Sequence, residues 1–162
     1  MKLSIKKGFS FGLTSGIITT LGLIVGLNSG THSRTVIISG IFVIAIADAM
    51  SDALGIHISE EAENKHTTKE IWESTIATFA SKFVFTLMFI TPILFLELVT
   101  AIIVCIIWGL FLISVFSYYL ARQQQIKPYK IVLEHLIIAI IVIALTHQIG
   151  NWVAALFGFF TP

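Results

Sequence analysis

Two aspartates, Asp48 and Asp52, lie inside an apolar segment, and their chemistry most needs an explanation. An ionised carboxylate within a membrane-spanning helix is costly unless it faces the interior of a helix bundle or binds a cation. On a helix that turns about 100° per residue, both aspartates share a face with Ser59 and Glu63. Because hard divalent cations prefer oxygen ligands, this spacing predicts a stripe of cation ligands running from within the membrane toward the water.

The composition predicts that this stripe belongs to an all-α integral membrane protein. Of the 162 residues, 56% are hydrophobic and only 12% are charged, which is too apolar for an ordinary soluble domain. A spanning helix needs about 20 mainly apolar residues. We expect a single transmembrane domain over residues 1–162 with a short acidic cytosolic link at 59–75. Its five spans are expected at about residues 8–27, 36–58, 76–96, 98–120 and 131–157.

The basic residues set the expected orientation. All Lys and Arg except Arg34 lie at the N-terminus or in and near the second and fourth connections. The positive-inside rule therefore places the N-terminus in the cytosol and the C-terminus outside, with the aromatic run Phe157 to Phe160 at the outer interface. We expect a multi-pass protein of the cell membrane in a prokaryote or of a vacuolar-type membrane in a eukaryote. The net charge of +1 gives no indication of nucleic-acid binding.

Lys82, near the cytosolic end of the third span, is a candidate counter-charge for the aspartates. A fixed ion pair would suit a non-transporting protein that serves assembly or metal sensing. The same lysine is compatible with transport, because its charge can hold the empty site until a cation arrives. Both interpretations stay open, whereas an enzyme is not expected because no nucleophile, histidine and acid converge in the sequence.

The acidic link is a second candidate region for metal binding. Glu60, Glu63 and Glu70 are predicted to form a vestibule that collects divalent cations, and the alternative is a solvated acidic surface at two helix ends. Thr67 followed by Glu70 has the form of a capping box. This pattern predicts that a new helix begins near Thr68.

Small residues four apart predict that the first helix packs closely against others. In lipid, such residues let helix backbones approach, and packing drives helix association. The glycines expected to act in this way are Gly8, Gly12, Gly16, Gly22 and Gly26.

Hydroxyl and imidazole groups add weaker candidates. Ser15 and Thr19 are four apart and are either hydroxyl ligands to a central path or groups that bond back to their own helix. His147 shares a face with Asn151 in the fifth span. It is either a proton relay or ligand, or a histidine with a structural role.

Three motifs resemble those of the vacuolar iron transporter family of iron and manganese exporters. The stretch SGIITTLGLIVGL in the first helix is similar to the family's DGL motif followed by small apolar residues. AIADAMSDALGIHISEEAE resembles its AGAxSMxxGxYxxxxxE motif, and ALTHQIGNWVAALFG resembles its fifth-helix ending. The resemblance implies a dimeric antiporter that exchanges divalent metal for protons and moves Fe²⁺ or Mn²⁺ out of the cytosol. It also implies an ion path near the dimer interface.

The sequence departs from the family pattern at positions that bear on this function. Ser15 stands where the family has an acid, and Asp52 stands where it has a methionine. The link 59–75 replaces the family's larger cytosolic metal-binding domain. A site that has only oxygen ligands favours harder cations such as Mn²⁺.

The expected function is therefore a divalent transition-metal transporter of the lipid bilayer, coupled to protons, forming a homodimer and needing no cofactor beyond the transported ion. The candidate metal ligands are Asp48, Asp52, Glu60, Glu63 and Glu70. The candidates for proton coupling or counter-charge are Asp48, Lys82 and His147.

Overall fold

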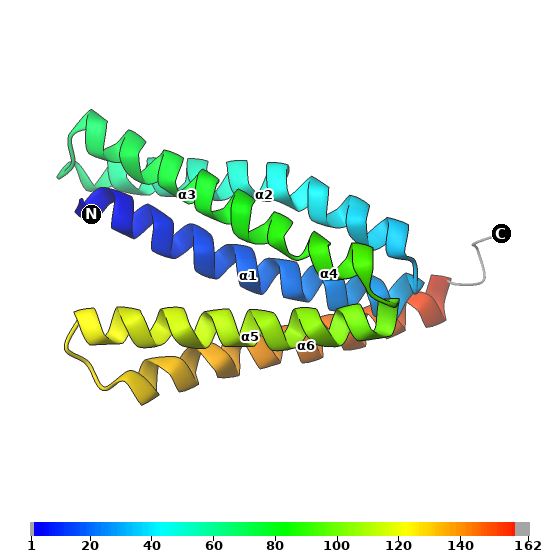
Figure 1. Ribbon diagram of the computed structural model, residues 1–162. Coiled ribbons are helices and arrows are strands. Elements are labelled where there is room, and N and C mark those ends of the chain that lie inside the picture. Colours follow the sequence, from blue (N-terminus) through cyan, green and yellow to red (C-terminus); the bar gives the residue numbers. More distant parts are fainter. Residues whose placement is uncertain (1, 158–162) are drawn as a thin grey trace. The chain divides into compact units, whose positions relative to one another are not determined.

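The computed structural model describes residues 2–157, and within this range the chain is helical except for short connections (Figure 1). The helices are α1 (Leu3–Thr31), α2 (Arg34–Glu63), α3 (Thr68–Met88), α4 (Ile90–Phe95), α5 (Leu98–Gln123) and α6 (Pro128–Phe157). With α3 and α4 taken together, five helical segments in the described range are long and apolar enough to cross a membrane. The predicted all-α class is thus confirmed, and the number of candidate spans agrees with the prediction.

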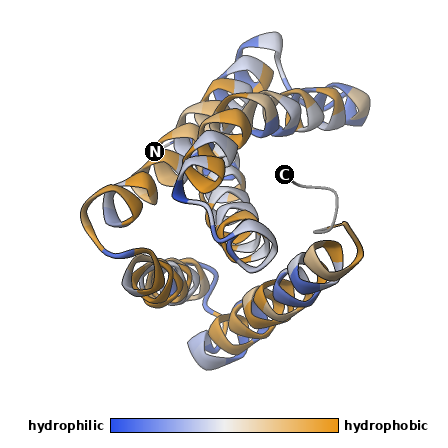
Figure 2. Cartoon of the chain, turned by 90° about the vertical axis from the view of Figure 1, so that its right-hand side faces the viewer, coloured by the Kyte–Doolittle hydropathy of each residue, from blue (hydrophilic) through white to orange (hydrophobic). Residues whose placement is uncertain are grey.

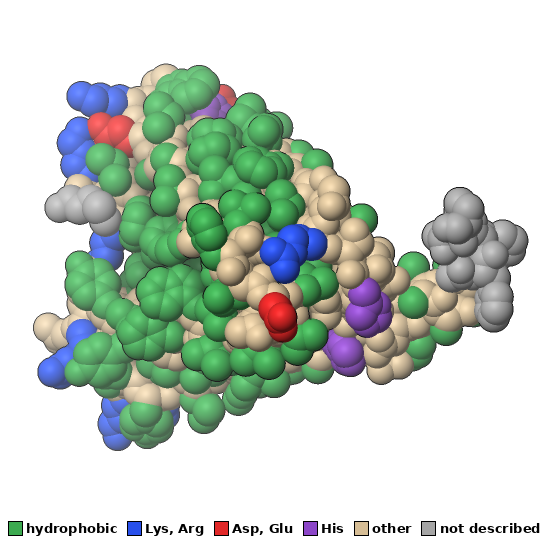
Figure 3. Space-filling view, turned by 45° about the vertical axis from the view of Figure 1, so that its right-hand side comes forward, with side chains coloured by type: hydrophobic (Ala, Val, Ile, Leu, Met, Phe, Trp, Pro, Cys, Tyr) green, Lys and Arg blue, Asp and Glu red, His purple; other side chains and the backbone are tan. Residues whose placement is uncertain are grey.

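Hydrophobic side chains dominate the helices. Figure 2 shows long hydrophobic stretches along them, with hydrophilic residues at the turns. The face in Figure 3 is largely covered by hydrophobic side chains. In water such a surface would be unfavourable, so its natural surroundings are lipid tails or other apolar helices.

The turn between α2 and α3 follows the predicted capping chemistry. The Thr67 side chain accepts a hydrogen bond from the backbone of Glu70, whose carboxylate in turn accepts from the backbone N–H of Thr67 at 2.9 Å. α2 ends at Glu63, and Asn64 takes a positive φ of 51°. The expected helix start near Thr68 is confirmed. The Thr67 hydroxyl and the Glu70 carboxylate accept hydrogen bonds from backbone N–H groups that have no partner within the first helical turn.

The third span is not the single continuous helix that the sequence predicts. It is interrupted at Phe89, between α3 and α4. Pro92 has no N–H to donate to the carbonyl of Met88, and its ring crowds that carbonyl, so the regular α-helical pattern stops one turn earlier. Part of one further prediction, residues 158–160 of the C-terminal aromatic run, lies outside the described residues.

The described chain divides into two compact units. The first contains residues 2–20 and 39–90, which include the N-terminal part of α1, most of α2 and all of α3. The second contains residues 21–38 and 91–157, in which α5 and α6 form a hairpin (Figure 1). Both candidate acidic regions belong to the first unit. The single transmembrane domain stays a prediction.

Candidate functional site

Three helices of the first unit bring the aspartates and the lysine together. Asp48 and Asp52 are one turn apart on α2, so both side chains project from the same face. Ser15 comes from α1 and Lys82 from α3. These four residues are called the aspartate–lysine cluster below.

The Lys82 ammonium is at the centre of the aspartate–lysine cluster. Its Nζ lies 2.5 Å from Oδ2 of Asp48 and 2.5 Å from Oδ2 of Asp52. It also donates to the Ser15 hydroxyl at 3.0 Å, and that hydroxyl donates to Oδ2 of Asp52 at 2.6 Å. Oδ2 of Asp48 has no hydrogen bond of acceptable geometry within the described residues, so its contact with Lys82 is an ion pair without the alignment of a hydrogen bond.

Burial within this cluster is unequal. The Lys82 side chain is 0% exposed, whereas those of Asp48 and Asp52 are 32% and 20% exposed. Two carboxylates and one ammonium leave one excess negative charge when all three are ionised. The excess charge thus sits on side chains that are partly accessible, although Oδ2 of Asp48 itself is buried, while the positive charge is enclosed.

The two hydroxyl candidates of α1 have different partners. Ser15 belongs to the aspartate–lysine cluster, as its contact with Asp52 shows. Thr19 instead donates to the carbonyl of Ser15, one turn earlier on its own helix, at 2.9 Å. Thr19 therefore fits the alternative of bonding back to its own helix, whereas Ser15 bonds to another helix and its role as a ligand stays a prediction.

Glycines on α1 allow α3 to come close enough to place Lys82. A side chain added at Gly8 would overlap the backbone of Ser74, and one added at Gly12 would overlap Thr78 and Ser81. At Gly16 an added Cβ would lie 3.2 Å from the carbonyl oxygen of Lys82. The spacing of these glycines therefore fixes the α1–α3 contact in the way expected of small residues in membrane helices.

α3 carries a polar stripe that the sequence analysis did not single out. Its members lie one, three or four residues apart and are all buried, and their helical periodicity is visible in the amino-acid sequence. They are Ser74, Thr78, Ser81, Lys82 and Thr86. Several of the hydroxyls bond to carbonyls of their own helix, as Thr78 does with Ser74 at 2.8 Å. The stripe therefore satisfies its polar groups within a tightly packed contact.

The acidic link forms a second cluster with the opposite pattern of burial. Glu60 is 1% exposed, accepts from the Ser74 hydroxyl and lies 3.2 Å from Nζ of Lys7. Lys7 is itself 39% exposed and lies 3.8 Å from Glu63, which contacts His66 at 3.3 Å. These four ionisable residues, Glu60, Glu63, His66 and Lys7, are called the link cluster below.

A pocket of about 290 Å³ adjoins the link cluster and is also lined by Glu70. The carboxylates around it are already engaged. A hydrogen bond from His66 and the charge of Lys7 hold the pKa of Glu63 below its ordinary value, and hydrogen bonds from Thr67 do the same for the pKa of Glu70. Across residues 2–157, no three His, Cys, Asp or Glu side chains are arranged to hold a metal ion. The structure thus brings Glu60, Glu63 and Glu70 to one pocket without forming a complete coordination shell.

His147 belongs to the second unit. Its Nδ1 lies 2.5 Å from the hydroxyl of Ser29, and its Nε2 lies 3.2 Å from the side-chain amide of Asn151. Both ring nitrogens therefore have a neutral partner, as expected for a histidine with a structural role.

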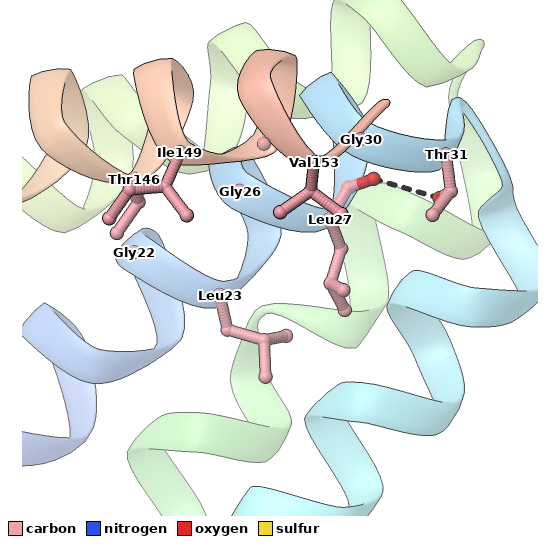
Figure 4. Close-up of a pocket in the computed structure, with 10 residues that line it drawn as sticks. Gly22, Leu23, Gly26, Leu27, Gly30, Thr31, Thr146, Ile149 and Val153 are labelled. Atoms are coloured by element: carbon pink, nitrogen blue, oxygen red, sulfur yellow. Dashed lines mark hydrogen bonds between the residues drawn. The ribbon is translucent and has the colours of Figure 1, made fainter. Parts of the chain in front are cut away.

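Glycines also shape the contact between α1 and α6 in the second unit. An open groove of about 370 Å³ runs along this contact, lined by Gly22, Gly26, Gly30, Gly150 and apolar side chains (Figure 4). A Cβ added at Gly26 would lie 3.4 Å from the carbonyl oxygen of Thr146. The dashed line in Figure 4 marks the hydrogen bond from the Thr31 hydroxyl to the carbonyl of Leu27, at 2.8 Å. This polar group is satisfied within its own helix.

Five apolar helices, with a cluster of ionised side chains held within the first three, define a multi-pass membrane protein. Residues 7–72 match the VIT family, which confirms the resemblance over the first two helices and the link. The match covers less than half of the 162 residues, and it shows similarity to that family over this part of the chain. A search of curated proteins finds no match to the chain.

Proposed function

We propose that the protein transports divalent transition-metal ions, Mn²⁺ or Fe²⁺, out of the cytosol in exchange for protons. The observation that carries this proposal is the aspartate–lysine cluster, in which two accessible carboxylates carry more charge than one enclosed lysine neutralises. An ionisable group inside a membrane span is by default a candidate for an ion pathway. The family match supports the same class of function.

The oxygens of the aspartate–lysine cluster suit Mn²⁺ better than a softer metal. Asp48 and Asp52 offer carboxylate oxygens and Ser15 a hydroxyl, and oxygen ligands with retained waters are those that Mg²⁺, Ca²⁺ and Mn²⁺ prefer. Metal and protons compete for the same carboxylates, which is the physical basis of exchange. We assign proton exchange to the aspartates and not to His147, because both nitrogens of its ring already have partners.

The contact between Ser15 and Asp52 supports the link to the family. By motif position, Ser15 replaces the family's acid on the first helix, and Asp52 replaces its methionine on the second. The two side chains are hydrogen-bonded at 2.6 Å. Moving the carboxylate from one helix to the other therefore keeps an acid at the same place in the bundle.

The link cluster is proposed as the cytosolic entrance. Its pocket gathers Glu60, Glu63 and Glu70 around one opening, and Glu63 is 45% exposed. Carboxylates whose pKa is lowered stay ionised at neutral pH and attract cations. We propose that this region concentrates metal ions but does not bind them firmly, because its carboxylates already have partners.

A homodimer is proposed because, among the described residues of the first unit, no helix covers one face of α2. Small residues one turn apart, Ala47, Ser51, Gly55 and Ser59, are exposed beside the aspartates. Nothing lies within 4 Å of a Cβ added at Gly55. Small exposed residues favour close helix contact in lipid. We place the N-terminus in the cytosol, as the positive-inside rule predicts, and expect the membrane to be the cell membrane or a vacuolar-type membrane.

Flux into liposomes tests the proposal. Purified protein is reconstituted, a pH gradient is imposed, and entry of Mn²⁺ and Fe²⁺ is followed for the native chain, Asp48→Asn and Asp52→Asn. The expected result is flux that depends on the gradient and falls at least about tenfold in either variant, a loss of roughly 1.4 kcal/mol or more. No flux of either ion with a folded native protein would refute the proposal.

The second candidate function is a non-transporting membrane protein locked by its ion pair. The complete burial of Lys82 between two carboxylates favours it, because breaking such a pair is strongly destabilising. In this case Lys82→Met lowers stability and has no transport phenotype, since there is no flux to change. For a transporter, the same variant folds and changes metal affinity or the pH dependence of flux.

A further inference from the structure

The charge balance of the aspartate–lysine cluster has a direct consequence for the cation that it accepts. Asp48 and Asp52 carry two negative charges, and Lys82 contributes one positive charge at 2.5 Å from each. In a region of low dielectric, the arrangement closest to neutral is strongly favoured. With the ammonium in this position, the cluster reaches neutrality by gaining one positive charge and not two.

We infer that Lys82 selects the charge of the cation that the aspartate pair binds. While its ammonium contacts both carboxylates, the pair matches a monovalent cation, and when the ammonium is withdrawn the pair matches a divalent cation. The inference rests on the proposed function only in treating this pair as the transport site. It makes Lys82 a residue that determines specificity, and it gives the site a second ligand class, a monovalent metal cation such as Na⁺.

The cost of removing water from the cation favours the same cation charge. A divalent ion bound to the carboxylate of either aspartate would share that carboxylate with an ammonium 2.5 Å from its Oδ2. For a divalent ion, both the repulsion from Lys82 and the attraction to the carboxylates would be twice those of a monovalent ion at the same place, whereas the cost of dehydration would be about four times as large. The accessible surfaces of Asp48 and Asp52 therefore admit a monovalent ion at lower cost as long as Lys82 stays.

Packing limits how Lys82 can leave the carboxylates. An added Cβ at Gly16 would be 3.2 Å from the carbonyl oxygen of Lys82 and 3.3 Å from its Cα, so the α3 backbone is held against α1 at this level. Rotation of the long side chain is then the smallest movement that frees the aspartates, because lysine has four flexible bonds and a compact charged end. The two cation classes thus correspond to two positions of one side chain.

Charge-altering variants test the inference. Equilibrium binding of radiolabelled Na⁺ and Mn²⁺ is measured on the purified full chain in detergent at constant ionic strength, with choline as the inert cation. Lys82→Met gives the cluster a formal charge of two minus. The double variant Asp48→Asn with Lys82→Met restores the native charge of one minus. Lys127→Met, which removes an exposed lysine from the connection between α5 and α6, is the matched control.

The expected result is that Lys82→Met raises the affinity for Mn²⁺ relative to Na⁺ at least about tenfold. The double variant and Lys127→Met keep the native ratio of Mn²⁺ affinity to Na⁺ affinity. A ratio that Lys82→Met leaves unchanged or moves toward Na⁺, or loss of all binding by this variant when folded, overturns the inference. If Lys82→Met does not fold, the test compares Asp48→Asn alone with the double variant. Asp48→Asn makes the cluster neutral, so it must lose the Na⁺ binding that the double variant retains. Equal Na⁺ binding by the two variants overturns the inference.

These outcomes separate the inference from the proposed function. Tighter Mn²⁺ binding by Lys82→Met, together with no flux through the native protein, upholds charge selection and refutes transport. Flux through the native protein, together with an unchanged ratio of Mn²⁺ affinity to Na⁺ affinity in Lys82→Met, upholds transport and refutes charge selection.

Discussion

The two acidic regions of the first unit contain similar groups in inverted arrangements. In the aspartate–lysine cluster the lysine is 0% exposed and its carboxylates are partly accessible, whereas in the link cluster Glu60 is 1% exposed and Lys7 is 39% exposed. An enclosed cation beside accessible carboxylates leaves negative charge available to an incoming ion. In the link cluster the enclosed carboxylate is paired with Lys7, and the accessible carboxylate of Glu63 is engaged by His66 and Lys7. Similar residue types therefore favour binding in one region and structural pairing in the other.

The largest expected difference between the clusters is in stability. Lys82→Ala leaves two carboxylates without their buried partner, so we expect the free energy of unfolding to fall by about 3–5 kcal/mol. Lys7→Ala removes a lysine that water can replace, and we expect a loss of about 1 kcal/mol or less. Reversible denaturation of the two variants in detergent measures both losses. Equal losses would contradict the inverted burial.

Glycine substitutions compare the two faces of the first unit that adjoin the aspartates. Gly12→Ala would overlap Thr78 and Ser81, and we expect it to destabilise the protein by about 1–3 kcal/mol. An alanine side chain at Gly55 would lie in open space in the structure. Because alanine has a better helix propensity than glycine, Gly55→Ala should raise the free energy of unfolding by about 0.5–1 kcal/mol. Thermal unfolding of the two variants checks this contrast. A destabilising Gly55→Ala would instead locate a partner against that face of α2.

The smallest expected effect concerns Glu70 and depends on pH. Its carboxylate accepts hydrogen bonds from Thr67, which lower its pKa below the ordinary value of 4.5. A lowered pKa in the folded state means that the stabilisation is complete above pH 4.5 and is lost as the pH falls through the lower value. Circular dichroism during acid titration should show this loss in the native chain. Glu70→Ala should lack that part of the titration, and an unchanged profile would contradict the capping role.

The sequence predicted the helical class, the capping box and the pairing of Lys82 with the aspartates, because each depends on local pattern or on the cost of burying charge. It did not predict that one lysine contacts both carboxylates, or that Glu60 is enclosed by Ser74. These contacts depend on how closely α1 and α3 approach. Periodicity shows which residues share a face of a helix, but the distance between facing helices is set by packing in three dimensions.

The break at Phe89 shows a second limit of sequence reasoning. Pro92 lies near the outer end of the third span, and a proline near a helix end is compatible with a kink, an early stop or an undisturbed first turn. Which of these occurs depends on the tertiary surroundings of the segment. In the structure, Arg34 donates to the carbonyls of Leu94 and Leu96, at 3.3 Å and 2.7 Å, and this contact satisfies the end of α4 after the break.

Direct binding of Mn²⁺ tests the central claim that the aspartate–lysine cluster, and not the link cluster, is the cation site. Electron paramagnetic resonance of free Mn²⁺ gives the bound fraction for the native chain, Asp52→Asn and Glu60→Gln, each purified and folded. We predict that Asp52→Asn weakens binding at least about tenfold and that Glu60→Gln changes it less than about threefold. Loss of binding in Glu60→Gln with native affinity in Asp52→Asn would contradict the account and assign the site to the link.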